Sequence, residues 1–350
     1  MRNLIFFFYL ILCTGLIFSM EVVPLPDVEN PGTMYVDSEN MYIGEKTSIY
    51  IYSLSNFKLL KKFGKKGEGP GEFLPPFGEE VHIHIQPDEL MVISSYRLSF
   101  FTKSGDFKRE MKCPPLILYN RYIRPLEKGF VASSLARGTA KEKNLIMISY
   151  NIYDSNFKAA KEIYRIRQGY QGPASKIKFN PITWTIIGPA VYSYDNKIFL
   201  GHYNNDGSGT MYVFDSNGKK LYEIHPEYEK VKFTEDDKKA FKKDSILQDG
   251  REFYENNKHL FDYPQYFPAR QWFEVVDNKI YIQTYKKDKT LGKNEFFILD
   301  LKGKLLKRVM LPLDHESYFT PYVYTVKNDK LYQVFEDDDE QWAVRITKIE

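Results

Sequence analysis

A pair of histidines is the first candidate for chemistry in this chain of 350 residues. His82 and His84 alternate within a short β-rich run, which places both side chains on the same face of one strand. Two histidines at this spacing can begin a metal site, and His202 is the candidate third ligand. The alternative is that they line a polar interior and hold no ion. No cofactor is predicted, and a bound divalent cation is the alternative left open.

Tryptophan and arginine side chains form a second candidate group. Trp184, Trp272 and Arg270 precede or open β-rich runs in the second half of the chain, and Arg97 opens another run in the first half. Trp and Arg are among the side chains that most often anchor a ligand or a protein partner. These four residues are therefore candidate ligand-binding residues, with a place in the hydrophobic core as the alternative for Trp272.

Two polar segments share some features with cation sites. Asn204–Gly209 lacks the full set of oxygen ligands and the distal glutamate of a Ca²⁺-binding loop, which favours a hairpin loop. The acidic run Glu336–Glu340 could hold a cation or a basic partner, but such a run is typical of a solvated loop. The sequence contains no Gly-x-Ser-x-Gly motif and no Ser, His and Asp at a spacing that supports a triad. No catalytic residue is predicted.

Repeated hairpins are the elements that must position these residues. One pattern, in which a turn of Ser, Asn, Asp or Gly separates two β-rich runs, occurs at Tyr52–Lys62, Phe101–Met111, Tyr153–Ile163, Phe214–Ile224 and Leu299–Val309. Another hairpin precedes each copy, as at Asp195–Gly201 and Asp277–Gln283. Such repetition indicates a fold in which each unit buries its surface against its neighbours.

Six four-stranded units follow from these hairpins, at about 33–63, 80–112, 119–165, 188–225, 270–311 and 320–348. We therefore predict an all-β, six-bladed β-propeller of four-stranded antiparallel blades. The sixth unit lacks a fourth strand, and Glu21–Leu25 is predicted to supply it and close the ring. A helical insertion is predicted at about 226–269, between blades four and five, where Thr234 can cap a helix with an acidic first turn.

One part of the chain resembles a known repeat. It combines a glycine-rich stretch, two strand-like runs and a glycine turn, at Phe63–Phe73, Leu90–Ile93, Arg97–Phe101 and Ser104–Phe107. This order is similar to the NHL repeat, and the chain resembles bacterial exported six-bladed propellers of the NHL and TolB-like type. It departs from the NHL pattern at His84-Ile-Gln86, where Val-Asp is usual. The resemblance implies the fold more than the function, because such proteins range from binding platforms to lyases and lactonases.

The N-terminal segment indicates export. Arg2 and the apolar run Leu4–Leu12 are typical of a signal peptide, with cleavage predicted after Ser19, so that 20–350 form the propeller. A membrane anchor is the alternative, but the apolar stretch is shorter than the roughly 20 residues of a span, and no transmembrane span is predicted after cleavage. A lipid anchor at Cys13 is disfavoured because Leu12 precedes it. Periplasmic, extracellular or envelope-associated locations all fit this prediction.

The connections between strands indicate where to look for function. In an antiparallel blade, the turns joining strands one and two and strands three and four lie on one face of the ring, here called the turn face. The links between blades and the connections between strands two and three lie on the other, the loop face. The long segments all belong to the loop face: 64–80, 135–144, 167–187, 202–209, 226–269, 285–294 and 336–340. Insertions gathered on one face often form a binding surface.

We therefore predict an exported binding module that holds a protein or a small-molecule ligand on the loop face. The formal net charge of +3 is close to balanced and argues against a nucleic-acid partner, which needs a strongly basic face. The alternative class is an enzyme, a metal-dependent lyase or lactonase at the mouth of the tunnel.

Overall fold

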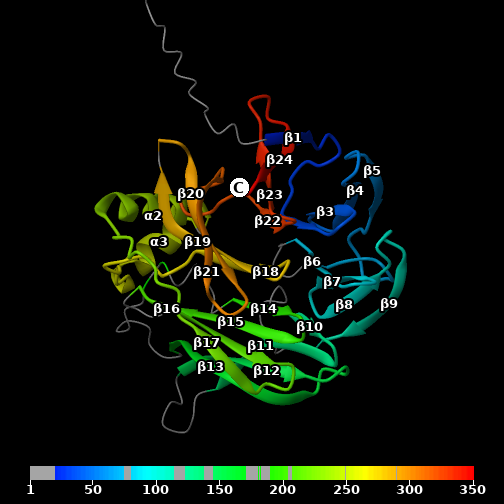
Figure 1. Ribbon diagram of the computed structural model, residues 1–350, viewed down its shortest axis with the longest axis horizontal. Helices are drawn as coiled ribbons and strands as arrows, with labels where there is room; N and C mark the ends of the chain where they lie inside the picture. Colours follow the sequence, from blue (N-terminus) through cyan, green and yellow to red (C-terminus); the bar gives the residue numbers. More distant parts are fainter. Residues whose placement is uncertain are drawn as a thin grey trace, which may run out of the picture.

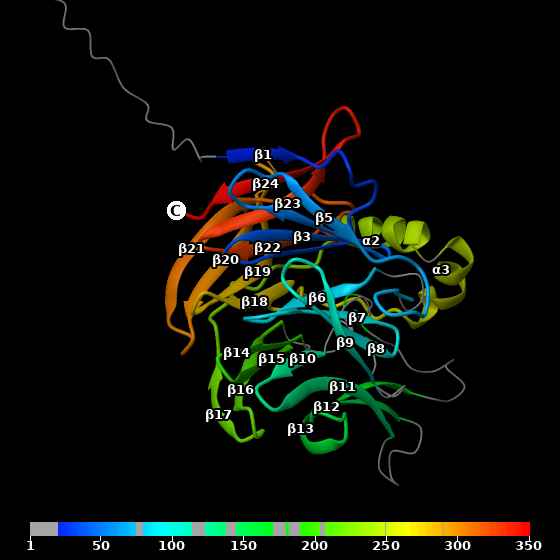
Figure 2. The same cartoon turned by 90° about the vertical axis from the view of Figure 1, so that its right-hand side faces the viewer.

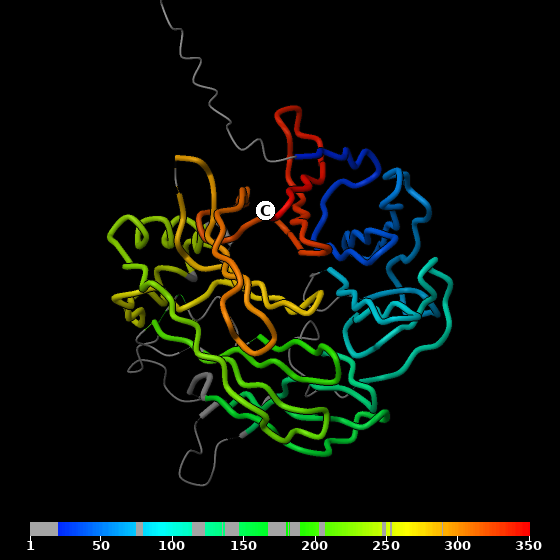
Figure 3. The backbone as a smooth tube through the Cα atoms, viewed as in Figure 1, coloured from blue at the N-terminus to red at the C-terminus, as the bar shows by residue number. Residues whose placement is uncertain are grey.

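The computed structural model shows a ring of six antiparallel sheets, each with four strands (Figure 1). It describes residues 20–74, 80–113, 123–137, 145–170, 180, 182, 190–203, 207–248, 250–288 and 290–350. The predicted six-bladed β-propeller is thereby confirmed. The chain passes from blade to blade around the ring in sequence order, as the colours of the backbone trace show (Figure 3).

Each of the first five blades uses four consecutive strands. Blade one consists of β2 (Thr33–Val36), β3 (Asn40–Glu45), β4 (Ser48–Ser53) and β5 (Leu59–Phe63). Blade two consists of β6 (His82–Ile85), β7 (Leu90–Ser94), β8 (Arg97–Phe101) and β9 (Phe107–Lys112). Blade three consists of β10 (Arg124–Leu126), β11 (Gly129–Arg137), β12 (Leu145–Tyr153) and β13 (Ala159–Tyr170).

The remaining blades follow the same plan. Blade four consists of β14 (Val191–Tyr194), β15 (Lys197–Tyr203), β16 (Gly209–Asp215) and β17 (Lys220–Ile224). Blade five consists of β18 (Trp272–Val276), β19 (Lys279–Asp288), β20 (Lys293–Asp300) and β21 (Leu305–Pro312). Blade six contains β22 (Tyr324–Lys327), β23 (Lys330–Glu336) and β24 (Trp342–Lys348), and β1 (Met20–Pro24) is its outer strand.

The N-terminal strand closes the ring, as predicted. β1 runs antiparallel to β24, with Met20 opposite Thr347 and Pro24 opposite Ala343. Val23 and Leu25 are buried in a hydrophobic cluster that joins blade six to blade one. Among the described residues, one hydrophobic cluster fills each of the six junctions between neighbouring blades. Each blade therefore depends on both of its neighbours for its core.

The repeated hairpin sequence has a physical reason in the turn between strands three and four. In blade four, Asp215 Oδ1 accepts hydrogen bonds from the backbone N–H groups of Asn217 and Lys219, at 2.9 and 2.8 Å. Gly218 adopts a positive φ of 73°, and after the turn the register of β17 shifts by one residue opposite Val213 and Phe214, which is a β-bulge. A turn with one left-handed residue and a bulge has a fixed length. The same Asp contacts recur in blades three and five.

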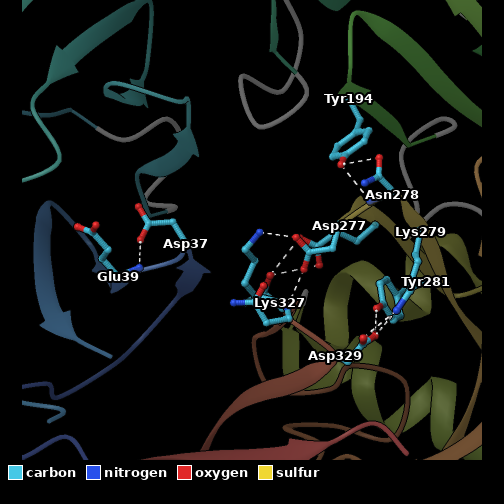
Figure 4. A network of polar contacts seen from close by, with 12 residues as sticks. Asp37, Glu39, Tyr194, Asp277, Asn278, Lys279, Tyr281, Lys327 and Asp329 are labelled. Atoms are coloured by element: carbon cyan, nitrogen blue, oxygen red, sulfur yellow. Dashed lines mark hydrogen bonds and ion pairs between the residues drawn. The ribbon is translucent and has the colours of Figure 1, made fainter. Parts of the chain in front are cut away.

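The turns between strands one and two hold adjacent blades together. Asp277 and Asn278 both have positive φ, as do Asn328 and Asp329, which is the backbone of a tight two-residue hairpin. Asp277 of blade five accepts hydrogen bonds from Lys327 Nζ and from the Asn328 backbone N–H of blade six (Figure 4). Asp329 of blade six accepts hydrogen bonds from Lys279 Nζ and the Tyr281 hydroxyl of blade five, at 2.6 and 2.8 Å. The repeated Asp, Asn and Lys residues therefore connect blades as well as forming turns.

The helical insertion is also confirmed. It contains α2 (Glu235–Gln248), α3 (Arg251–Asn257) and the 3₁₀ turn η5 (Lys258–Leu260), which together we call the arm. Thr234 caps α2: its Oγ1 accepts a hydrogen bond from the Asp237 N–H at 3.3 Å and donates one to Asp237 Oδ2 at 2.6 Å. The arm lies at one edge of the propeller seen from the side (Figure 2).

Aromatic and polar contacts fix the arm to the ring. Phe241 of α2 lies in a buried cluster with Phe267 and with Tyr285 of β19. The Tyr318 hydroxyl, in the link between blades five and six, donates a hydrogen bond to Asp237 Oδ1 at 2.7 Å. The Phe319 backbone N–H lies 3.4 Å from Asp244 Oδ2. Asp237 and Asp244 are both buried, so the arm is part of the propeller surface and not a free extension.

Removing residues 20–27 should lower the free energy of unfolding by several kcal/mol. The deletion exposes one edge of β24 and takes Val23 and Leu25 out of the junction between blades six and one. Urea unfolding followed by Trp fluorescence measures the change against a chain that lacks residues 1–19 only. An unfolding curve that does not move between these two chains would contradict closure by β1.

Candidate functional site

Six side chains occupy one equivalent position around the axis of the ring. Every inner strand ends in a two-residue turn, and the closing backbone pairs of these turns fix the register of all six blades. In each blade, one side chain lies two residues before the residue that closes this turn. From blade one to blade six, these side chains are Tyr35, His84, Arg124, Tyr192, Glu274 and Thr325. We call this set the polar layer. Each of its members is at least partly buried.

Neighbouring members of the polar layer contact one another. The rings of Tyr35 and His84 lie 6.3 Å apart, and His84 Nε2 lies 2.7 Å from Arg124 Nη1. The Arg124 guanidinium carbon lies 4.9 Å from the centroid of the Tyr192 ring, within the range of a cation–π interaction. Four consecutive blades are therefore connected through these side chains.

The contacts continue on the other side of the ring. Thr325 Oγ1 donates a hydrogen bond to the Glu274 carboxyl group, at 3.0 Å from Oε1, and the Val326 backbone N–H donates another to Oε2 at 3.1 Å. These contacts join blades five and six in the same layer. The polar layer thus holds one guanidinium, one carboxyl group, one imidazole and two phenols close to the axis.

Burial shifts the protonation of the Glu274 carboxyl group. Loss of solvent raises its pKa to about 7, and the hydrogen bonds from Val326 and Thr325 and the charge of Arg124 oppose this rise only in part. A carboxyl group with such a pKa changes its charge near neutral pH. Strongly shifted pKa values of this kind cluster at functional sites, which makes Glu274 a candidate functional residue.

His84 and Tyr192 stay neutral. Burial, followed by the charge of Arg124, holds the pKa of His84 well below its ordinary value. Because Arg124 can only donate, Nε2 of His84 is the acceptor, which leaves the ring proton on Nδ1. Burial and then the charge of Glu274 raise the pKa of Tyr192 well above its ordinary value. Near neutral pH, the charge of the layer therefore depends on the protonation of Glu274, whose pKa lies at about 7.

A chain of hydrogen bonds leads from the inner strands to the arm. The Tyr324 hydroxyl, one residue from the polar layer, donates to Gln283 Oε1, and Gln283 Nε2 donates to Gln271 Oε1 at 3.1 Å. Gln271 Nε2 in turn donates to the Phe319 carbonyl. Phe319 lies against the arm through its ring contact with Phe241. The polar layer and the arm are therefore joined by a series of partly buried contacts.

The predicted metal ligands do not come together. His82 and His84 share β6, as expected, but His202 lies on β15 of blade four, where its ring is 5.8 Å from that of Tyr164. In the described part of the chain, no group of three or more His, Cys, Asp or Glu residues is placed to hold a metal ion. The physical reason is that strand β15 is the second strand of its blade, whereas β6 is an innermost strand.

The predicted ligand-binding residues occupy different places. Arg97 donates hydrogen bonds to the carbonyls of Glu68, Gly67 and Glu72, which fixes the glycine-rich link between blades one and two. Arg270 is buried, with Nη1 3.3 Å from the His202 carbonyl and its guanidinium carbon 5.0 Å from the Phe273 ring centroid. Trp272 on β18 packs edge-on against Tyr324 at 4.7 Å. Trp184 lies outside the described residues.

Several predicted loops are shorter in the structure than expected. The acidic run 336–340 is a tight turn in which Asp337 Oδ1 accepts the backbone N–H groups of Asp339 and Gln341, at 3.0 and 2.9 Å. The contacts match those of Asp215 in blade four, and they engage the Asp337 carboxylate with backbone N–H groups. Strands β19 and β20 extend through most of 285–294. Only part of 204–209 lies within the described residues.

Arg124, Tyr192 and Glu274 are the functional candidates that the sequence prediction missed. The sequence did hold a signal for them. Each lies two positions before the residue that closes the first turn of its blade, and the repeated turns locate this position in every blade. The sequence prediction instead weighted residue types, namely Trp, Arg and paired His. The lone Cys113 outside the N-terminal segment is buried, and burial raises the pKa of its thiol to about 11, which makes the thiolate scarce at neutral pH.

Comparison with known proteins adds little beyond the architecture. No model of a known protein family matches the chain, and no curated protein does. A crystal structure of a member of the DUF4221 family from Bacteroides vulgatus aligns with 94% of this chain and 96% of that chain, at 14% identity and a TM-score of 0.49. The Pan2 WD40 domain of Neurospora crassa aligns with 91% of this chain and 89% of that chain, at 10% identity and a TM-score of 0.43. The fold assignment rests on the sheet topology of the chain itself.

Replacing Glu274 by Gln should stabilise the protein at alkaline pH. The pKa of this carboxyl group is about 7 in the folded state and 4.5 for an exposed glutamate, so ionisation favours the unfolded chain. The stability of the wild type therefore falls as the pH rises from about 4.5 through 7. Glu274→Gln should gain up to about 3 kcal/mol above pH 8 and little below pH 5.

Thermal unfolding of both proteins between pH 5 and pH 9 measures this effect. Glu295→Gln is a matched control, because Glu295 is also buried in blade five but is paired with Arg308. A difference in midpoint between Glu274→Gln and the wild type that is the same at every pH would contradict the assignment.

Proposed function

We propose that the protein is an exported binding module whose ligand reaches the polar layer from the loop face of the ring. The observation that carries the proposal is the polar layer itself, with one guanidinium and one carboxyl group near the axis of a ring built from apolar junctions. Burying ionisable groups costs free energy that apolar residues of similar size would not cost. Buried ionisable groups are most often found where they bind a ligand or take part in a reaction.

The arm supports the choice of the loop face. It belongs to the link between blades four and five, and Phe241 and Asp237 hold it against blade five and against the link that follows. Because the contacts are buried, the surface around the arm exists before any ligand arrives. A preorganised surface loses less conformational entropy on binding than a mobile loop does.

Export and family membership belong to the same proposal. The signal-peptide pattern in residues 1–19 and the glycine-rich link before Phe73, held by Arg97, support an exported propeller of the NHL and TolB-like type. Within the described residues, no helix has the length and apolar character needed to cross a membrane. The ligand class that suits the polar layer is a small polar molecule with hydrogen-bonding groups for Arg124 and Glu274, and a protein partner would contact the arm.

Native mass spectrometry of the protein purified from its own host tests this proposal. A tag added after Glu350 leaves the loop face free, because the chain ends beside the turn of blade six, where the Ile349 N–H donates to the Asp329 carbonyl at 2.8 Å. We expect a co-purifying molecule on the wild type, with an occupancy reduced about tenfold in Arg124→Gln.

Arg165→Gln is the matched control, since Arg165 lies on the outer strand β13 of blade three and pairs with Glu162 at 2.6 Å. It should retain the molecule at the level of the wild type. A wild type that carries no molecule, or equal occupancy in Arg124→Gln and the wild type, would contradict the proposed site.

A further inference from the structure

Exposed apolar side chains recur at one position of the outer strands. The turn between strands three and four closes at Lys58, Asp106, Lys219 and Lys304 in blades one, two, four and five. The large apolar residues that follow directly, or one residue later, are all exposed, namely Leu59, Leu60, Phe107, Leu221, Leu305 and Leu306. In blade six the outer strand is β1, whose Met20 and Val22 are 57% and 50% exposed. We call these eight residues the apolar rim.

The apolar rim covers five consecutive blades and is centred on the N-terminal strand. The blades follow one another around the ring as four, five, six, one and two, with β1 in the middle of this series (Figure 1). Blade three, on the far side, has Ala159 at the same position, followed by Ala160. The strongest exposure lies on blades five, six and one, where Leu60, Leu305 and Leu306 are 59%, 51% and 51% exposed. Apolar exposure is therefore concentrated on one side of the ring.

Cationic side chains accompany the apolar rim. Lys58 and Lys304 stand directly before the leucine pairs of β5 and β21, and Lys62 and Lys307 follow within the same strands. Glu21, between Met20 and Val22, is the acidic residue within the rim of β1. Leucine side chains beside lysines are the composition of surfaces that enter the interface of a bilayer and contact its anionic headgroups.

The path of the chain points to the same surface. β1 occupies the place of a fourth strand, so Met20 lies at the turn-face end and Pro24 at the loop-face end. The sequence before Met20 contains the apolar run from Leu4 to Phe18. Before the predicted cleavage after Ser19, a segment suited to a membrane or to an export channel therefore precedes β1, the strand at the centre of the apolar rim.

We propose that the apolar rim docks on the surface of an anionic bilayer. Leu59, Leu60, Leu305 and Leu306 enter the headgroup region on both sides of β1, and the neighbouring lysines contact lipid phosphates. The rim lies beside the turn face, so docking leaves the loop face and the arm directed away from the lipid. This inference concerns a surface that the proposed ligand site does not use, and either can fail without the other.

Co-sedimentation with lipid vesicles tests the docking. The protein is taken as the host processes it, and mass spectrometry verifies that every version has the same N-terminus. The rim variant carries Leu59→Ser, Leu60→Ser, Leu305→Ser and Leu306→Ser. The control carries Tyr96→Ser and Leu291→Ser, because these side chains are 54% and 61% exposed in loop-face connections of blades two and five.

We expect the wild type and the control to bind vesicles in which about a third of the lipid is anionic, and to bind neutral phosphatidylcholine vesicles much more weakly. The partition of the rim variant into anionic vesicles should fall by about tenfold or more. A second variant, with Lys58→Gln, Lys304→Gln and Lys307→Gln, keeps the apolar residues and should lose most of the salt-sensitive part of the binding. Near-UV circular dichroism checks that each variant keeps the wild-type packing.

Three results would overturn the docking. The first is equal partition of the rim variant and the wild type. The second is wild-type binding to neutral vesicles that equals binding to anionic ones. The third is a wild-type oligomer in lipid-free solution that the rim variant dissociates, because the rim would then join copies of the chain.

Discussion

The pairing of β1 with β24 is the constraint on which the rest of the ring depends. A propeller blade has little core of its own, and here a hydrophobic cluster of described residues fills each of the six junctions between blades. A ring that is open at one junction would expose both of its faces to water. Closure by the N-terminal strand therefore protects a whole junction in addition to five residues of backbone pairing.

Closure also determines where polar groups can be placed. With six apolar junctions complete, the inner strands bring one side chain from each blade to the same level near the axis. Glu274 can lie in this layer because its carboxyl group accepts hydrogen bonds from Thr325 and Val326. Arg124 can lie there because its guanidinium donates to His84 Nε2. The turn face is stabilised separately, by the contacts of Asp277 and Asp329 across blades five and six. The polar layer and the turn-face contacts thus use different residues of the same repeat.

Much of the architecture could be predicted from local sequence. The turns repeat because one Asp side chain and one left-handed residue determine their length, and such signals are visible without a structure. The cap at Thr234 is equally local. Residue type alone was a poor guide to the site, because Arg97 and Arg270 donate to backbone carbonyls that are distant in sequence, those of the link at Glu72 and of His202 in β15. The layer of Tyr192 and Glu274 depends on the relative register of blades, which follows from the closed ring and not from any one segment.

The closure between the two ends of the chain has a consequence for folding. Trp342 Nε1 donates to the Glu29 carbonyl across 313 residues, and β1 pairs with β24, the last strand of the ring in sequence order. The first strand to leave the ribosome is therefore among the last to find its partner, and such distant contacts make folding slow. A ring that cannot close until β24 is available stays open for longer. The edge that β24 offers to β1, and the apolar junction beside it, are therefore completed late in folding.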